Sequence, residues 1–158
     1  MSTNPKPRRP SRRVRITAIH EAGHIIACLR LHVPFNSASI HADKIGLGRV
    51  VVDFASAKPE NQIVVLLCGS AAERLLIPPK SRSISDWLAS RADQQESEML
   101  VSSVHPTWGE DQTTEYLKQM TSEADKLVAD NKDAILDIAQ ALLERGKIEG
   151  REIVQGWQ

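Results

Sequence analysis

The stretch TAIHEAGHIIACLRL, residues 17–31, decides how this chain folds, because its apolar residues recur at helical spacing. It predicts an α-helix from about Val14 to Leu31 that ends before Pro34, since the residue before a proline avoids helical backbone angles. Within this helix His20 and His24 are four residues apart, so their side chains lie one above the other on the same face.

The five residues from His20 to His24 spell HExxH, and this spacing allows both imidazoles to bind one metal ion. Zinc accepts such nitrogens at roughly 2.0–2.1 Å, and a catalytic zinc site also needs a third protein ligand and an open position for water. Glu21 is turned by about 100° around the helix axis, so it is predicted to reach the water and act as a general base. The alternative is a core helix that matches the motif by chance.

The spacing of the residues does not by itself identify the third metal ligand. A histidine six residues after His24 would indicate a metzincin, but Arg30 stands there and excludes that class. His32 and Cys28 lie too far along the helix axis to share one small ion with both histidines. The remaining type of zinc site takes its third ligand from a carboxylate on a later helix, and the candidates are Glu73, Asp86, Asp93, Glu96 and Glu98. Two isolated histidines, His41 and His105, are further candidates.

Length and composition are typical of one globular domain. The chain has 158 residues, 41% of them hydrophobic and 25% charged. Its two cysteines, Cys28 and Cys68, form no CxxC pair and are predicted to be buried, reduced thiols. No apolar run approaches the length of a membrane span, and the basic N-terminus has no apolar core behind it. We therefore expect no membrane span, no secretory signal and a cytoplasmic location.

Charge is unevenly distributed, although the formal net charge is zero. Residues 1–15 contain six Lys/Arg and no acid, so the remainder has an excess of six acidic residues. Three prolines and few apolar residues predict a disordered basic arm over residues 1–13, followed by one domain over residues 14–158. Such an arm is more often a solubilising tail or a linker than a contact with nucleic acid, so nucleic acid is not the expected partner.

The segments after the first helix predict a small sheet and a second helix. Ser37–His41 and the β-branched run Leu47–Phe54 indicate a hairpin. Pro59 suits the first position of the next helix. The small residues Gly69 to Ala72 indicate that this second helix packs closely behind the HExxH helix.

The second half of the chain is predicted to be helical. One helix is expected from Trp87 to Ser103, with an N-cap near Ser83–Asp86. Another helical pattern runs from Glu110 to Arg145 with a break near Asn131, and Gly146 is its predicted C-terminal cap. The predicted fold class is therefore mainly α (α+β), with one small β-sheet.

Several segments together resemble the FtsH-type zinc peptidases, which are normally the proteolytic half of membrane-anchored AAA+ proteases. HEAGH, residues 20–24, is identical to the family's motif, and LLCGSAAE, residues 66–73, is similar to the family's LLGGRAAE helix. Residues 39–48 resemble its strand and Leu-Gly element, and residues 141–153 resemble its closing helix and turn. The resemblance covers about residues 14–155 and implies a helical, zincin-like peptidase domain.

The resemblance also implies a third ligand. SRADQQ, residues 90–95, is similar to the segment whose aspartate completes the family's zinc site, which assigns that role to Asp93. Ala92 departs from the family, which usually has asparagine there, and Asp86 is better explained as a helix-start residue. The family's ATPase is not represented, because no Walker A sequence GxxxxGK[ST] occurs. We expect one Zn²⁺ held by His20, His24 and Asp93, and leave a partner ATPase or a homo-oligomer open.

The resulting hypothesis is an ATP-independent zinc metalloendopeptidase that cleaves flexible or unfolded polypeptides, with Glu21 as its general base. The strand around Leu47, Gly48, Arg49 and Val50 is expected to bind an extended peptide by edge addition, as in the family. One alternative is a proteolytically weak, zinc-holding binding or adaptor module that contacts nucleic acid through its basic arm. Another is a regulatory protease of the ImmA/IrrE kind, which cleaves a specific repressor.

Overall fold

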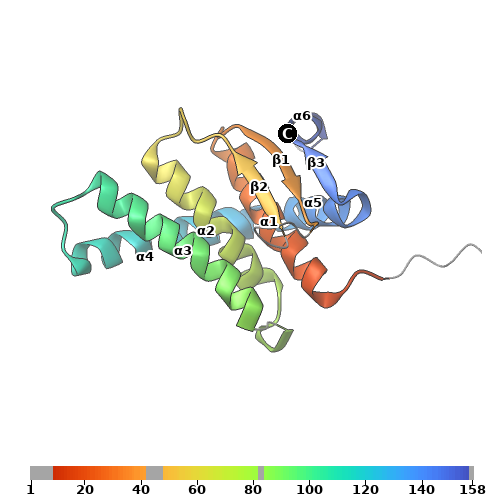
Figure 1. Cartoon of the computed structure of the whole chain (residues 1–158), viewed down its shortest axis with the longest axis horizontal. Coiled ribbons are helices and arrows are strands. Elements are labelled where there is room, and N and C mark those ends of the chain that lie inside the picture. The colour runs from red at the N-terminus through yellow and green to blue at the C-terminus, as the bar shows by residue number, and fades with distance from the viewer. Residues whose placement is uncertain (1–8, 42–47, 82–83, 157–158) are drawn as a thin grey trace, which may run out of the picture.

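The computed structural model describes residues 9–41, 48–81 and 84–156, and their elements are arranged around the HExxH helix (Figure 1). That helix, α1, covers Arg12–Arg30 and contacts α2, α4, α5 and the sheet. Ser11 is its N-cap and accepts a 3.3 Å hydrogen bond from the Val14 N–H. The helix therefore begins two residues earlier than predicted and includes the last two residues of the predicted arm. The first eight residues of that arm lie outside the described residues.

The strands form one antiparallel sheet in the order β2-β1-β3. The first two, β1 (Phe35–Ser39) and β2 (Arg49–Val52), pair antiparallel as predicted, with Ala38 opposite Val50. The third strand, β3 (Lys147–Glu149), is not predicted from the sequence and pairs with the other side of β1. Within the described sheet β2 is therefore an edge strand.

Helices make up most of the described chain, which confirms the predicted fold class. The helix α2 (Pro59–Leu76) begins at the predicted proline, and a short 3₁₀ helix (Pro79–Ser81) leads to α3 (Ile84–Val104). The later helices are α4 (Glu110–Asp130), α5 (Lys132–Arg145) and the unpredicted α6 (Gly150–Gly156). The proposed N-cap residue Ser83 lies outside the described residues.

Asn131 separates α4 from α5, as the sequence predicts. Its side-chain amide donates a 2.8 Å hydrogen bond to the Leu127 carbonyl and accepts a 2.7 Å bond from the Arg30 guanidinium. At the end of α5, Gly146 has a φ of 75°, a left-handed conformation that favours glycine, and its N–H donates to the Leu142 carbonyl over 2.7 Å. The predicted break and the predicted cap are both confirmed.

Both cysteines are buried free thiols, which confirms the prediction for them. Burial raises the pKa of Cys28 and of Cys68 to about 12, so both remain protonated and behave as small apolar residues. Among the described helices, none combines the length and the apolar character that crossing a membrane requires.

The helices α1 and α2 pack closely against each other at Gly23. A Cβ added to Gly23 would collide with the Cys68 carbonyl oxygen and would lie 2.9 Å from the Ala72 Cβ. The predicted close approach of these two helices is therefore confirmed, and it brings the backbones of α1 and α2 nearly into contact. One face of the HExxH helix is consequently pressed against α2.

Replacing Gly23 with alanine is expected to destabilise the fold by about 1–3 kcal/mol, the usual cost of overpacking a core. The added methyl group would meet a backbone carbonyl, which cannot rotate away, and this outweighs the higher helix propensity of alanine. Urea unfolding measures the change. Gly109→Ala is the control, because a Cβ there meets nothing within 4 Å, and its effect should stay below about 1 kcal/mol. A Gly23→Ala protein as stable as the wild type would contradict the packing described above.

Candidate metal centre

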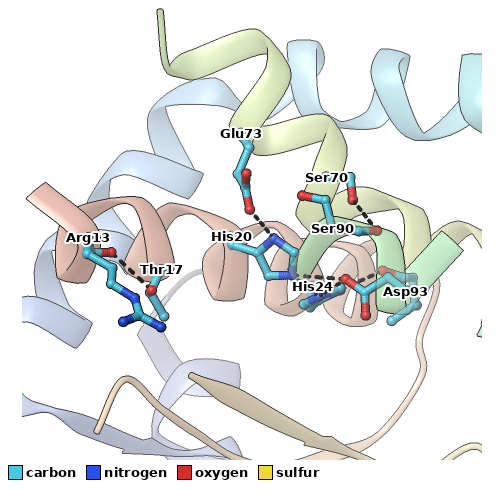
Figure 2. Close-up of polar contacts among 9 residues, drawn as sticks. Arg13, Thr17, His20, His24, Ser70, Glu73, Ser90 and Asp93 are labelled. Carbon is cyan, nitrogen blue, oxygen red and sulfur yellow. Dashed lines mark hydrogen bonds and ion pairs between the residues drawn. The ribbon is translucent and has the colours of Figure 1, made fainter. Parts of the chain in front are cut away.

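Three potential ligand atoms from α1 and α3 face one another in the interior, as Figure 2 shows. The Nε2 atoms of His20 and His24 are 3.0 Å apart. The Oδ2 atom of Asp93 lies 2.9 Å from Nε2 of His20 and 3.3 Å from Nε2 of His24. Both histidines are buried, and the Asp93 side chain is 19% exposed. Within the described residues, these three side chains form a group that could hold a metal ion.

The hydrogen bonds of the two Nδ1 atoms show which atoms of the group are acceptors. Nδ1 of His20 is 2.5 Å from Oε1 of Glu73, and Nδ1 of His24 is 2.8 Å from the Val65 carbonyl oxygen. A carbonyl and an ionised carboxylate can only accept, so both Nδ1 atoms carry the proton. In a neutral imidazole the Nε2 atom is then an acceptor. The two Nε2 atoms and Oδ2 of Asp93 therefore direct lone pairs at one another, and only a positive charge among them relieves the repulsion.

Gly69 on α2 leaves room beside the ligand atoms. A Cβ at this position would lie 2.5 Å from Nε2 of His24 and 2.6 Å from Nε2 of His20. Any larger residue would press on the two nitrogens that face Asp93. The absent side chain, the converging acceptors and the lack of a hydrogen-bond donor to Oδ2 of Asp93 among the described residues all fit a bound cation.

The electrostatics of the group favour a positive charge as well. Burial lowers the pKa of His20, but the nearby carboxylates of Asp93, Glu73 and Glu21 raise it by more, so the pKa lies well above 6.5. His24 behaves in the same way, and Asp93 is the main cause that raises its pKa. Burial alone would raise the pKa of Asp93, but the two histidines outweigh burial and lower it. The carboxylates therefore make both imidazoles bind a proton more readily than free histidines do, and a metal ion would compete with that proton.

Glu21 lies beside the metal group, against the start of β2. Its side chain is buried, and burial raises the pKa of its carboxyl. A Cβ on Gly48 would lie 2.6 Å from Oε1 of Glu21, so the backbone before β2 touches this carboxylate. Glu21 is not one of the three converging side chains. Its position suits a group that acts on a molecule held between β2 and the metal.

Of the predicted substrate-binding residues, Gly48 is therefore the one that touches Glu21. Arg49 is exposed at the start of β2, and Val50 pairs with Ala38 of β1. Leu47 lies outside the described residues. The outer edge of β2 thus begins next to the buried carboxylate of Glu21.

Most other candidates for the third ligand lie elsewhere. Glu96 and Glu98 are exposed on α3. The His41 ring packs against Gly146, and His105 stacks on Trp108 with ring centroids 3.6 Å apart. Asp86 belongs to a part of α3 whose side chains lie outside the described part of the structure. Of the carboxylates with described side chains, Asp93 is the one that reaches both Nε2 atoms.

Glu73 reaches the histidines from the opposite side, because it bonds Nδ1 of His20 rather than facing Nε2. A partner on the outer nitrogen fixes the tautomer and the ring orientation of a metal-binding histidine and increases its basicity. Val65 does the same for His24 through its backbone carbonyl. Neither role is predicted from the sequence. A carboxylate on an otherwise apolar helix is a signal that could have identified Glu73, whereas a backbone carbonyl leaves no trace in the sequence.

Comparison with known proteins adds no assignment. No protein-family model and no curated protein sequence matches this chain. The function of the site is therefore inferred from its own geometry and chemistry.

Replacing Asp93 with asparagine is expected to lower the affinity for Zn²⁺ at least about 100-fold, because it removes the one anionic atom that faces both Nε2 atoms. Competition with a chromophoric chelator measures the affinity. Glu96→Gln is the matched control, since Glu96 is an exposed carboxylate on the same helix and should leave the affinity unchanged. Equal affinities in the Asp93→Asn and wild-type proteins would place the third ligand elsewhere.

Metal binding is expected to release protons at neutral pH. The pKa values of His20 and His24 both lie above 6.5 in the metal-free group, so protons compete with the metal even near pH 7. Affinity should therefore fall as the pH is lowered from 8 to 6, more steeply than for two histidines of ordinary pKa. Calorimetric titration with Zn²⁺ in buffers of different ionisation enthalpy counts the released protons. A buffer-independent heat at pH 7 would show that the histidines are already deprotonated.

Proposed function

We propose that this chain is a zinc metalloendopeptidase in which His20, His24 and Asp93 hold one Zn²⁺ and Glu21 is the general base. The observation that carries the proposal is the convergence of three buried acceptor atoms next to a buried carboxylate with a raised pKa. Two imidazoles and one carboxylate are ligands that zinc favours, and three protein ligands leave one position open for water or substrate. A purely structural zinc site is closed and has no use for a base such as Glu21.

The proposed chemistry divides between the metal and the chain. A zinc ion held by His20, His24 and Asp93 would supply a Lewis acid, able to polarise a carbonyl and to make water a stronger acid. Glu21 accepts a proton from the attacking water and returns it to the leaving amine. Its raised pKa suits the first step, because burial makes this carboxylate a stronger base than an exposed glutamate. Glu73 and Val65 keep the two imidazoles in the orientation that metal binding needs.

The proposed substrate is a flexible or unfolded polypeptide. Among the described strands the outer edge of β2 has no neighbour, and an extended peptide can add to such an edge as a further strand. Gly48 places the beginning of this edge against Glu21, so a peptide bound there would pass the base. A helix, or a strand already paired on both sides, has no free backbone groups for this edge. The proposed reaction requires no nucleotide, and we propose a cytoplasmic location.

This proposal agrees with the resemblance to the FtsH-type zinc peptidases, which is carried by HEAGH, by residues 66–73 and by residues 90–95. These three segments supply the two histidines, the orienting Glu73 and the carboxylate of Asp93. The agreement supports one metal centre built from all three segments, and the base Glu21 beside it favours a peptidase over an adaptor module.

Replacing Glu21 with glutamine is expected to leave zinc binding intact and to lower the hydrolysis of an unfolded substrate such as casein about 10²–10⁴-fold, the usual contribution of a general base. The amide cannot accept the proton of the attacking water. Release of fluorescent fragments from labelled casein measures the activity, and metal analysis of the same samples measures zinc content.

A Glu21→Gln protein that cleaves casein at the wild-type rate would refute the mechanism. A wild-type protein that binds zinc and cleaves no polypeptide would favour the binding module instead. The Asp93→Asn variant serves as a second control, because it should lose activity together with zinc, whereas Glu21→Gln should lose activity alone.

A further inference from the structure

The helix α3 carries Asp93 but is held to the rest of the molecule by few buried side chains. It packs mainly against α2 (Figure 1). Of its described side chains, those of residues 90–104, only Ser97 and Val101 are buried. The helix α2, by contrast, buries nearly all of residues 63–73. Residues 90–104, the α3 strap, therefore gain little stabilisation from apolar burial.

Asp93 joins the α3 strap to the HExxH helix. Its Oδ2 atom lies 2.9 Å from Nε2 of His20 and 3.3 Å from Nε2 of His24. A longer hydrogen bond, 3.4 Å from the Ser70 hydroxyl to the Ser90 carbonyl, connects the strap to α2. Because the three atoms that meet at Asp93 are all acceptors, this contact is attractive only while a positive charge lies among them.

The ligand atoms are closed off from solvent, so a metal ion reaches them only if part of the chain moves. His20 and His24 are buried, and so is the Oδ2 atom of Asp93. The helices α1 and α2 are held together by the backbone contact at Gly23. The α3 strap meets the Nε2 atoms from another side and with less apolar contact. Opening of the strap is therefore the movement that costs least free energy.

We infer that the α3 strap opens to admit a metal ion to His20 and His24 and is fastened when Asp93 binds that ion. A divalent ion accepts all three lone pairs at once, whereas a proton bridges only two of the three atoms. The strap is therefore held less firmly without metal, while the packing of α1 on α2 persists. The inference rests on the metal site of the proposed function, adds a regulation of that site by metal supply, and is independent of peptide hydrolysis.

Hydrogen–deuterium exchange of the full chain, measured by mass spectrometry, compares the metal-free and zinc-loaded proteins. Without metal, the strap amides should exchange at least about tenfold faster than the amides of residues 63–73, after correction for intrinsic rates. Zinc should slow exchange of the strap amides at least about tenfold more than that of the α2 amides. Equal protection of both helices without metal, or exchange of the strap that zinc does not change, overturns the inference.

Asp93→Asn separates fastening of the strap from metal binding by the histidines. At a zinc concentration that saturates this variant, its strap amides should still exchange within about threefold of the metal-free rate, because the anionic ligand on α3 is missing. Glu96→Gln is the matched control, since Glu96 is an exposed carboxylate on the same helix, and it should show the full slowing by zinc. Equal slowing in Asp93→Asn and the wild type overturns the inference.

Val101→Ala loosens the strap away from the ligands. It should speed the release of zinc to an excess of chelator at least about fivefold, because the ion leaves only when the strap opens. Val128→Ala makes the same change at an equally buried valine of α4 and should alter the release rate less than about twofold. Equal release rates in the two variants overturn the inference.

The outcomes separate this inference from the proposed function. A wild-type protein that binds no zinc refutes both. Zinc binding and casein cleavage, combined with strap exchange that does not depend on zinc, refute the strap inference alone. Strap exchange that depends on zinc and on Asp93, without any cleavage of casein, supports the strap inference and refutes the peptidase.

Discussion

The contact between the backbones of α1 and α2 at Gly23 is the constraint on which the site depends. It brings α2 so close that Gly69 lies beside both Nε2 atoms, Glu73 reaches Nδ1 of His20, and the Val65 carbonyl reaches Nδ1 of His24. A wider separation would weaken all three contacts together. The HExxH spacing places the imidazoles on one face of a helix, but α2 determines their tautomers and hence which nitrogens are left to bind a metal.

This arrangement concentrates acceptors in the interior, which is costly for the folded state unless a positive charge is present. His20, Glu21, His24 and Glu73 are all buried, and Asp93 is mostly buried. A proton shared by the group offsets part of this cost, as the raised pKa values of the two histidines indicate. A divalent cation would offset more of this cost, since it can accept all three lone pairs at once. A metal ion bound by this group would therefore also stabilise the fold.

Much of the fold follows from local patterns. The apolar period of residues 17–31, the proline that begins α2, the break at Asn131 and the glycine after α5 all act within one or two helical turns. The strand β3 is different, because Lys147–Glu149 is too short to show a period and is a strand only through its pairing with β1. The residues of the site differ in the same way in how far local sequence predicts them. His20, Glu21 and His24 follow from spacing, whereas Asp93 came from a resemblance and the roles of Glu73 and Val65 depend on how α2 packs.

The β2 edge would recognise a polypeptide through its backbone. Backbone hydrogen bonds at such an edge give affinity for any extended segment and little preference among side chains. Gly48 places the start of this edge against Glu21, so the strand that would bind the substrate also touches the proposed base. The three side chains that could hold the metal come from α1 and α3 instead. Substrate binding and metal binding would therefore depend on separate elements that meet at Glu21.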